Sequence, residues 1–116
     1  MLRLASIIAI IGWCVSIAGA QPVTKPIKLF NGKNLDGWTA KFAKHDVGDN
    51  YANTFRVADG MILARYDGYG GNYDAQFGHL YFNRPYAYYL VTMEYRFVGE
   101  LYSGAPSYTL RNSGIM

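Results

Sequence analysis

Glu94 and Arg96 lie two residues apart in a stretch where apolar and polar side chains alternate. In a β-strand, side chains at this spacing project from the same face, about 7 Å apart. A carboxylate beside a guanidinium could remove a proton from a substrate carbon while the cation stabilises the negative charge that develops. An ordinary ion pair on a solvated sheet face would explain the same two residues.

Arg111, Asn112 and Ser113 form a second candidate set. They offer a forked cation, an amide and a hydroxyl, which suit a ligand that carries several hydroxyl groups. Gly114 would let a ligand or another backbone approach closely. A strand end with a bulge or turn at Asn-Ser-Gly accounts for the same residue types.

His79, Asp67 and Tyr69 are further candidates. A histidine titrates near neutral pH and suits proton transfer, but His79 lies among aromatic residues, where a structural role is the alternative. Asp67 and Tyr69 border a glycine-rich loop and could line a groove, although packing of that loop would explain them equally. His45 lies in a charged loop and is expected to be exposed.

Asp46, Asp49 and Asn50 could supply oxygen ligands to calcium. Their spacing does not fit the calcium loop of an EF-hand, so we expect a solvated turn. The sequence has no G-x-S-x-G elbow, no phosphate-binding loop and no H-E-x-x-H motif. No cofactor is therefore expected, and a structural or catalytic metal ion stays an open alternative.

Residues 1–20 have the layout of a helical signal peptide, with Arg3 before an apolar run from Leu4 to Val15 and Ala18-Gly19-Ala20 as the cleavage site. A membrane-spanning helix would need about 20 apolar residues and no cleavage site. We therefore expect a secreted or periplasmic protein with no stable membrane anchor after cleavage. Cys14 is the one cysteine of the sequence, so the mature chain can form neither a disulfide nor a thiolate zinc site.

The formal net charge of +3 is spread along the chain without a basic cluster. A nucleic-acid-binding protein would concentrate lysine and arginine on one face, so no nucleic-acid partner is expected. The 11 tyrosines and six phenylalanines supply rings that could stack on sugars. A carbohydrate is the partner that this composition favours.

We expect β-strands to carry these residues. Residues 55–57 alternate in polarity and Asp59-Gly60 supplies a turn before residues 61–66, which predicts a β-hairpin. The longest alternation, from Tyr86 to Val98, predicts a strand with one apolar and one polar face. No helix is expected after residue 20, because aromatic residues and glycines are dense between residues 66 and 89.

The two ends of the mature chain differ in character. Residues 21–26 contain two prolines and predict an extended linker, and turn signals at Asn31-Gly32 and Asp36-Gly37 predict a compact loop around a buried Trp38. Residues 111–116 resemble the middle of a strand without a following turn or cap. We therefore expect one incomplete domain.

Four stretches carry a family resemblance. Residues 29–38, with the sequence LFNGKNLDGW, resemble the opening signature of the 3-keto-disaccharide hydrolase family. Residues 57–62, 89–97 and 111–115 resemble the family's first hairpin, its central strand and a later motif, in the same order. The resemblance identifies residues 27–116 as the N-terminal part of such a domain.

The resemblance implies an all-β fold, a concanavalin-like jelly-roll β-sandwich that is incomplete at the C-terminus. It implies a hydrolase that acts on glycosidic bonds of 3-keto-sugars, because a 3-keto group acidifies the neighbouring C2–H and lets a base begin the cleavage. For this reaction, the candidate catalytic residues are Glu94, Arg96 and His79. The candidate substrate-binding residues are Arg111, Asn112, Ser113, Asp67 and Tyr69.

Two other hypotheses compete with this one. Sandwich folds host lectins as well as enzymes, so the chain could be a non-catalytic secreted carbohydrate-binding module. A half-sandwich would also leave sheet edges unpaired and an apolar face uncovered, in which case the chain would aggregate and have no function of its own.

Overall fold

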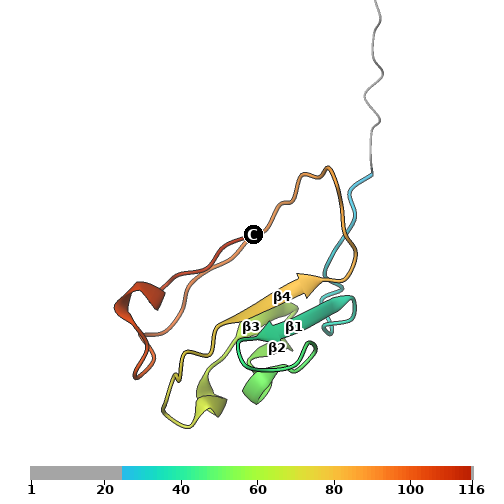
Figure 1. Ribbon diagram of the computed structural model, residues 1–116. Helices are drawn as coiled ribbons and strands as arrows, with labels where there is room; N and C mark the ends of the chain where they lie inside the picture. The colour runs from blue at the N-terminus through green and yellow to red at the C-terminus, as the bar shows by residue number, and fades with distance from the viewer. Residues whose placement is uncertain (1–24, 116) are drawn as a thin grey trace, which may run out of the picture.

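A computed structural model describes residues 25–115 of the chain, so the signal peptide expected over residues 1–20 lies outside the described residues. The fold consists of strands, three-residue 3₁₀ turns and irregular segments (Figure 1). In chain order the elements are β1 (Trp38–Phe42), η1 (Tyr51–Asn53), β2 (Phe55–Ala58), β3 (Met61–Ala64), η2 (Asp67–Tyr69), β4 (Gly78–Phe82) and η3 (Ser107–Thr109). The expectation of an all-β chain is confirmed.

Strands β1 and β4 form an antiparallel two-stranded sheet, in which Trp38 lies opposite Phe82 and Phe42 lies opposite Gly78. Alternate residues of β1 face the interior, and Phe42 is only 1% exposed. The Phe42 ring occupies the space above Gly78, where an added Cβ would lie 2.2 Å from a ring carbon. At the other end of the sheet the Trp38 and Phe82 rings meet edge to face, with centroids 5.2 Å apart.

Strands β2 and β3 form the predicted hairpin, with Phe55 opposite Ala64 and Ala58 opposite Met61. Asp59 and Gly60 connect them with φ angles of 52° and 72°. Positive φ at both central residues is typical of a type I′ turn, whose twist matches that of the flanking strands. The hairpin prediction is therefore confirmed.

Aromatic rings connect the two sheets. The Phe42 ring lies 5.5 Å from Phe55 and 6.2 Å from Tyr51, and Tyr51 lies 5.1 Å from Tyr69. The buried hydroxyl of Thr54 bonds the carbonyl oxygen of Tyr51 at 2.6 Å and the Tyr69 hydroxyl at 3.1 Å. This small core joins β1, β2 and the turns η1 and η2, because each of them supplies a ring or the hydroxyl.

The loop before β1 forms as expected. The side-chain oxygen of Asn31 accepts hydrogen bonds from the backbone N–H groups of Lys33 and Asn34, at 2.7 and 3.0 Å. The indole N–H of Trp38 donates to the carbonyl oxygen of Leu29 at 3.1 Å. Trp38 is half-buried rather than fully buried.

The strand predicted from Tyr86 to Val98 is not formed, and this prediction was wrong. Within the described chain, the backbone groups of residues 84–101 make no hydrogen bond to other backbone groups, and the segment runs as a long trace away from β4 (Figure 1). Tyr88 and Leu90 are 97% and 96% exposed. Alternating polarity describes two faces, but a strand also requires a neighbour that pairs with its N–H and C=O groups.

Between residues 25 and 115 the strands form two sheets of two strands each. The jelly-roll sandwich expected from the family resemblance therefore stays a prediction.

No helix within residues 25–115 is long and apolar enough to cross a membrane.

Candidate functional site

An open hollow of about 400 Å³ lies where the β2–β3 hairpin meets the segment that follows residue 97. We call it the Asp67 hollow. Its lining combines two arginines and two carboxylates with two tyrosine rings; the residues are Arg56, Ala64, Arg65, Tyr66, Asp67, Val98, Gly99, Glu100 and Tyr102. Charged groups beside exposed rings suit a ligand that has both hydroxyl groups and an apolar face.

Arg56 and Asp67 form a two-pronged ion pair at this hollow. The Nη1 and Nη2 groups of Arg56 donate to the two oxygens of Asp67 at 2.9 and 2.6 Å. The Nε group of Arg56 donates to the carbonyl oxygen of Asn53 at 2.6 Å, which fixes the plane of the guanidinium. The fork geometry of guanidinium and carboxylate gives the pair a defined orientation.

The hydrogen bonds from Arg56 lower the pKa of the Asp67 carboxyl below its ordinary value. The same bonds raise the pKa of Arg56. Asp67 is therefore ionised at neutral pH, and its carboxylate can accept hydrogen bonds from ligand hydroxyl groups. A low pKa also makes this carboxylate a weak base, so Asp67 is suited to binding rather than to proton abstraction.

Tyr66 and Tyr102 form the aromatic wall of the hollow. Tyr66 is 44% exposed, and its ring lies 5.4 Å from Tyr69 and 6.0 Å from Tyr102. The Tyr102 hydroxyl accepts a hydrogen bond from the backbone N–H of Gly71 at 2.9 Å. This contact attaches the segment after residue 97 to the turn η2.

Tyr69, one of the predicted substrate contacts, lies beneath Tyr66 and is buried. Its hydroxyl bonds the Thr54 hydroxyl, and burial raises the pKa of Tyr69 above its ordinary value. The described position makes Tyr69 a support for the exposed ring of Tyr66.

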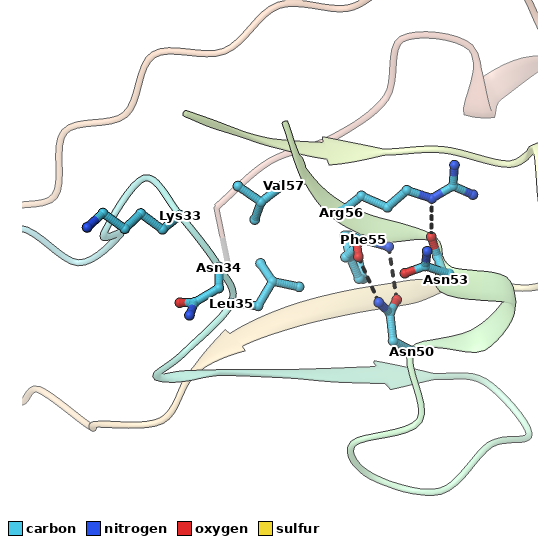
Figure 2. A pocket seen from close by; sticks show the side chains of 8 residues that line it. All are labelled: Lys33, Asn34, Leu35, Asn50, Asn53, Phe55, Arg56 and Val57. Atoms are coloured by element: carbon cyan, nitrogen blue, oxygen red, sulfur yellow. Dashed lines mark hydrogen bonds between the residues drawn. The ribbon is translucent and has the colours of Figure 1, made fainter. Parts of the chain in front are cut away.

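A second open hollow, of about 510 Å³, also has Arg56 in its lining (Figure 2). We call it the Asn50 hollow, and it is lined by Lys33, Asn34, Leu35, Asn50, Asn53, Phe55, Arg56 and Val57. The amide of Asn50 exchanges two hydrogen bonds with the backbone of Phe55, at 2.7 and 2.9 Å (Figure 2). This amide holds the loop before η1 against β2, and Arg56 borders both hollows.

His79 lies on β4, on the face of the sheet opposite Phe42. Lys41 of β1 lies directly opposite His79 in the strand pair. The ring centroid of His79 lies 5.9 Å from that of Tyr81, which is on the same face of β4. His79 is exposed and lies outside the lining of both hollows.

Glu94 and Arg96 lie on the unpaired segment and are both exposed. The described residues form three ion pairs, Lys44–Asp74, His45–Asp49 and Arg56–Asp67, and neither Glu94 nor Arg96 takes part in them. The structure therefore does not pair the two residues with each other.

Arg111, Asn112 and Ser113 lie after η3 and are exposed. The side-chain amide of Asn112 donates to the carbonyl oxygen of Tyr108 at 3.0 Å, and Arg111 has a φ of 53°. Of the eight predicted site residues, Asp67 lines the Asp67 hollow, and Tyr69 packs against the lining residue Tyr66. The roles assigned to all eight stay predictions.

The sequence did not predict the surroundings of two residues, Arg56 and His45. In the sequence, Arg56 is only the polar residue between Phe55 and Val57, and nothing local indicates its pairing with Asp67. His45 was expected to be exposed, and this was wrong. Its ring bonds Asp49 at 2.9 Å and the buried Gln76 at 3.1 Å, and packs 4.4 Å from the ring of Tyr51.

The calcium site considered as an alternative for Asp46, Asp49 and Asn50 receives no support. Asp49 bonds His45, and the side chain of Asn50 bonds the backbone of Phe55. Within residues 25–115, no group of three or more histidine, cysteine, aspartate or glutamate side chains is arranged to hold a metal ion.

Comparison with known proteins gives one positive result. A family model described as a 3-keto-alpha-glucoside-1,2-lyase-like domain matches residues 25–116. No curated protein and no solved structure shows a significant match to the chain.

Proposed function

The chain belongs to the family of 3-keto-alpha-glucoside-1,2-lyase-like domains, and from this premise we propose that it acts on glycosidic bonds of 3-keto-sugars. The family match over residues 25–116 is the observation that carries the proposal, and it supports a function related to carbohydrates. We propose a net hydrolysis that begins as an elimination between C1 and C2.

The chemistry follows from the ketone. A carbonyl at C3 acidifies the hydrogen on C2, so a base can remove that proton and leave the electron pair as an enolate. The enolate then re-forms the carbonyl and expels the C1 oxygen, which takes up a proton, and a C1=C2 double bond remains. Water adds across this bond, with oxygen at C1 and hydrogen at C2, so the sum of the steps is hydrolysis.

The residue roles in this proposal rest on residue chemistry. Glu94 is the candidate base, and Arg96 or Arg111 would stabilise the enolate. His79 would deliver a proton to the departing oxygen. Asn112 and Ser113 would bind sugar hydroxyl groups.

The Asp67 hollow is the proposed place for one sugar ring. The ionised Asp67 supports hydrogen bonding to hydroxyl groups, and the exposed face of Tyr66 supports stacking, with Tyr69 beneath it. The proposed complete fold around this hollow is the two-sheet jelly roll of the sequence-based expectation.

A solvent-isotope experiment tests the route. The full chain is incubated with a 3-keto-glycoside in D₂O, and the released 3-keto-sugar is analysed by mass spectrometry. Elimination followed by hydration leaves one deuterium at C2, whereas direct hydrolysis leaves none. The released sugar alone in D₂O controls for spontaneous exchange.

The assignment of the base is tested with the two glutamates of the chain. Glu94→Gln should lower kcat at least about 100-fold. Glu100→Gln, in the lining of the proposed sugar-binding hollow, should act on KM and change kcat little. Loss of activity in the second variant alone would move the base to Glu100.

The second candidate function is a non-catalytic carbohydrate-binding module. The exposed Tyr66 ring beside an ionised carboxylate favours it, because these groups bind sugars without any need for a base. Saturable binding of a glycoside without turnover, lost in Tyr66→Ala, would select this function over the enzyme.

We also propose that the protein is secreted or periplasmic, through cleavage of the signal peptide after Ala20. N-terminal sequencing of the mature protein should then begin at Gln21.

A further inference from the structure

The ion pair between Arg56 and Asp67 keeps donors and acceptors that neither residue uses. A guanidinium has five N–H groups. Arg56 uses three of them, on the carbonyl oxygen of Asn53 (Figure 2) and on the two oxygens of Asp67, so each Nη atom keeps one N–H group. Each oxygen of Asp67 accepts one hydrogen bond from Arg56 and has room for a second. The two side chains are 30% and 68% exposed, so a ligand can reach these groups.

The free groups of the two residues lie side by side. A two-pronged pair is planar, so the free N–H group of each Nη atom and the free acceptor position of the oxygen that it bonds point to the same edge of the pair. The nitrogen and the oxygen are 2.6 Å apart at one edge and 2.9 Å apart at the other. Because Arg56 and Asp67 both line the Asp67 hollow, the pair presents a donor next to an acceptor there.

We propose that this edge binds the α-hydroxyketone of a 3-keto-sugar: Arg56 donates to the carbonyl oxygen at C3, and Asp67 accepts from the hydroxyl group at C4. The inference rests on the proposed function, from which it takes the substrate class. It goes beyond it by giving Arg56 a direct contact with the ketone on which the reaction depends.

The polarity of the ligand matches the polarity of the pair. A ketone oxygen only accepts hydrogen bonds and a guanidinium only donates them, while the neighbouring hydroxyl group can donate to a carboxylate, which only accepts. An unoxidised sugar has a hydroxyl group at C3, whose own proton would need a further acceptor. The edge therefore favours the oxidised ring.

The course of the reaction distinguishes the two hydroxyl groups beside the ketone. The proton leaves from C2, and a carboxylate held next to C2 would oppose the negative charge that develops there, so the C4 hydroxyl group is the one assigned to Asp67. That charge moves onto the C3 oxygen as the enolate forms. The hydrogen bond from Arg56 therefore becomes stronger in the transition state.

The residues that carry this inference lie in the well-packed part of the chain. Asn53 fixes the plane of the Arg56 guanidinium, and Tyr66 directly precedes Asp67. The Tyr66 ring is 44% exposed and is supported by the buried Tyr69, so it can cover an apolar face of the sugar ring. All of these residues lie between residues 53 and 69, next to the aromatic core.

An uncleavable ligand tests the contact with the ketone. 3-Keto-1,5-anhydroglucitol keeps the ketone and both neighbouring hydroxyl groups but has no glycosidic bond. With ¹³C at C3, its carbonyl resonance should move downfield when it binds the full chain, because a hydrogen bond polarises the carbonyl group. Arg56→Lys keeps the positive charge but loses the fork, so it should weaken binding about tenfold or more and reduce the shift.

The matched control for this variant is Arg84→Lys. The Arg84 guanidinium lies over the Tyr86 ring and outside the lining of both hollows, so the substitution should change neither the affinity nor the shift. Absence of binding, binding without a carbonyl shift, or equal effects of the two lysine variants would overturn the proposal.

A second ligand tests the contact between Asp67 and the C4 hydroxyl group. The 4-deoxy derivative of the same ligand should bind the original chain about tenfold more weakly, and Asp67→Ala should bind the two ligands equally, because the contact is then already lost. Asp74→Ala, which removes a carboxylate paired with Lys44 outside both hollows, should keep the full difference. A difference that persists in Asp67→Ala would overturn the assignment of Asp67.

These measurements need no turnover, so they separate this inference from the proposed function. The predicted responses to Arg56→Lys and Asp67→Ala in a chain that does not cleave 3-keto-glycosides would support the hydroxyketone site and reject the proposed hydrolysis. Cleavage of 3-keto-glycosides by a chain in which ligand binding is insensitive to Arg56→Lys would support the hydrolysis and overturn the site.

Discussion

At the scale of single residues, the Arg56–Asp67 pair decides what the Asp67 hollow can bind. Arg56 is held by Asn53 and by both oxygens of Asp67, so the carboxylate keeps a fixed orientation. An ionised, oriented carboxylate accepts hydrogen bonds from hydroxyl groups. The sequence pointed to Asp67 as a groove residue but not to Arg56, because their contact depends on the hairpin that separates them along the chain.

The ion pair between Arg56 and Asp67 leads to a prediction about the titration of the Asp67 carboxyl group. NMR titration should place the Asp67 midpoint below the ordinary value of about 3.9, and Arg56→Met should raise it toward that value. Because the pKa is lower in the folded state, the stability that the pair contributes is present above pH about 3.9 and is lost as the pH falls through the folded pKa. Arg65→Met is the control and should move the midpoint less, since Arg65 acts on Asp67 only through its charge. Equal shifts in the two variants would contradict this account.

The buried hydroxyl of Tyr69 makes a second prediction, at the alkaline end. Burial raises the Tyr69 pKa, so the folded state favours the neutral phenol, and stability should fall as the pH rises from about 10 through the folded pKa. Tyr69→Phe should reduce this alkaline loss and cost about 0.5–1.5 kcal/mol at neutral pH, because Thr54 keeps its bond to Tyr51. Thermal unfolding at pH 7 and pH 10.5 measures both effects. Tyr108→Phe, at an exposed position, should change neither.

At the scale of elements, the pairing of two neighbouring strands could be predicted from the turn between them. The pairing of two strands far apart along the chain could not. The β2–β3 hairpin could be predicted because its turn residues, Asp59-Gly60, lie between its strands and tolerate positive φ. The β1–β4 sheet could not, since about 35 residues separate its strands and no local pattern states which of them pair. The sequence therefore predicted the compact loop around Trp38 but not the strand that begins there.

The close packing of Phe42 on Gly78 leads to a prediction about the stability of the β1–β4 sheet. Gly78→Ala would place a methyl group 2.2 Å from the Phe42 ring, so the ring or the strands must move. We expect a loss of about 1–3 kcal/mol in the free energy of unfolding, measured by urea denaturation. Gly114→Ala is the matched control, because no atom lies within 4 Å of its added Cβ and the change should be small. An unchanged unfolding midpoint for Gly78→Ala would mean that β1 and β4 do not pair in this register.

At the scale of the whole molecule, the described residues include a part whose backbone groups are hydrogen-bonded in sheets and turns and a part whose backbone groups are not. The two small sheets and their turns share one aromatic core, whereas residues 84–101 have free backbone groups. The sequence predicted the all-β class but not that residues 84–101 would be unpaired. The alternation from Tyr86 to Val98 indicates which side chains would share a face of a strand, but it does not indicate which strand would pair with it. The same limit applies to Glu94 and Arg96, whose surroundings depend on that partner.

Hydrogen exchange distinguishes the hydrogen-bonded strands from residues 84–101. In dilute solution the amides of residues 38–42 and 78–82 that bond across the β1–β4 sheet should exchange slowly, and those of residues 84–101 should exchange quickly, because only the first group is hydrogen-bonded within the chain. Slow exchange of residues 92–98 would instead assign them a partner strand within the same chain.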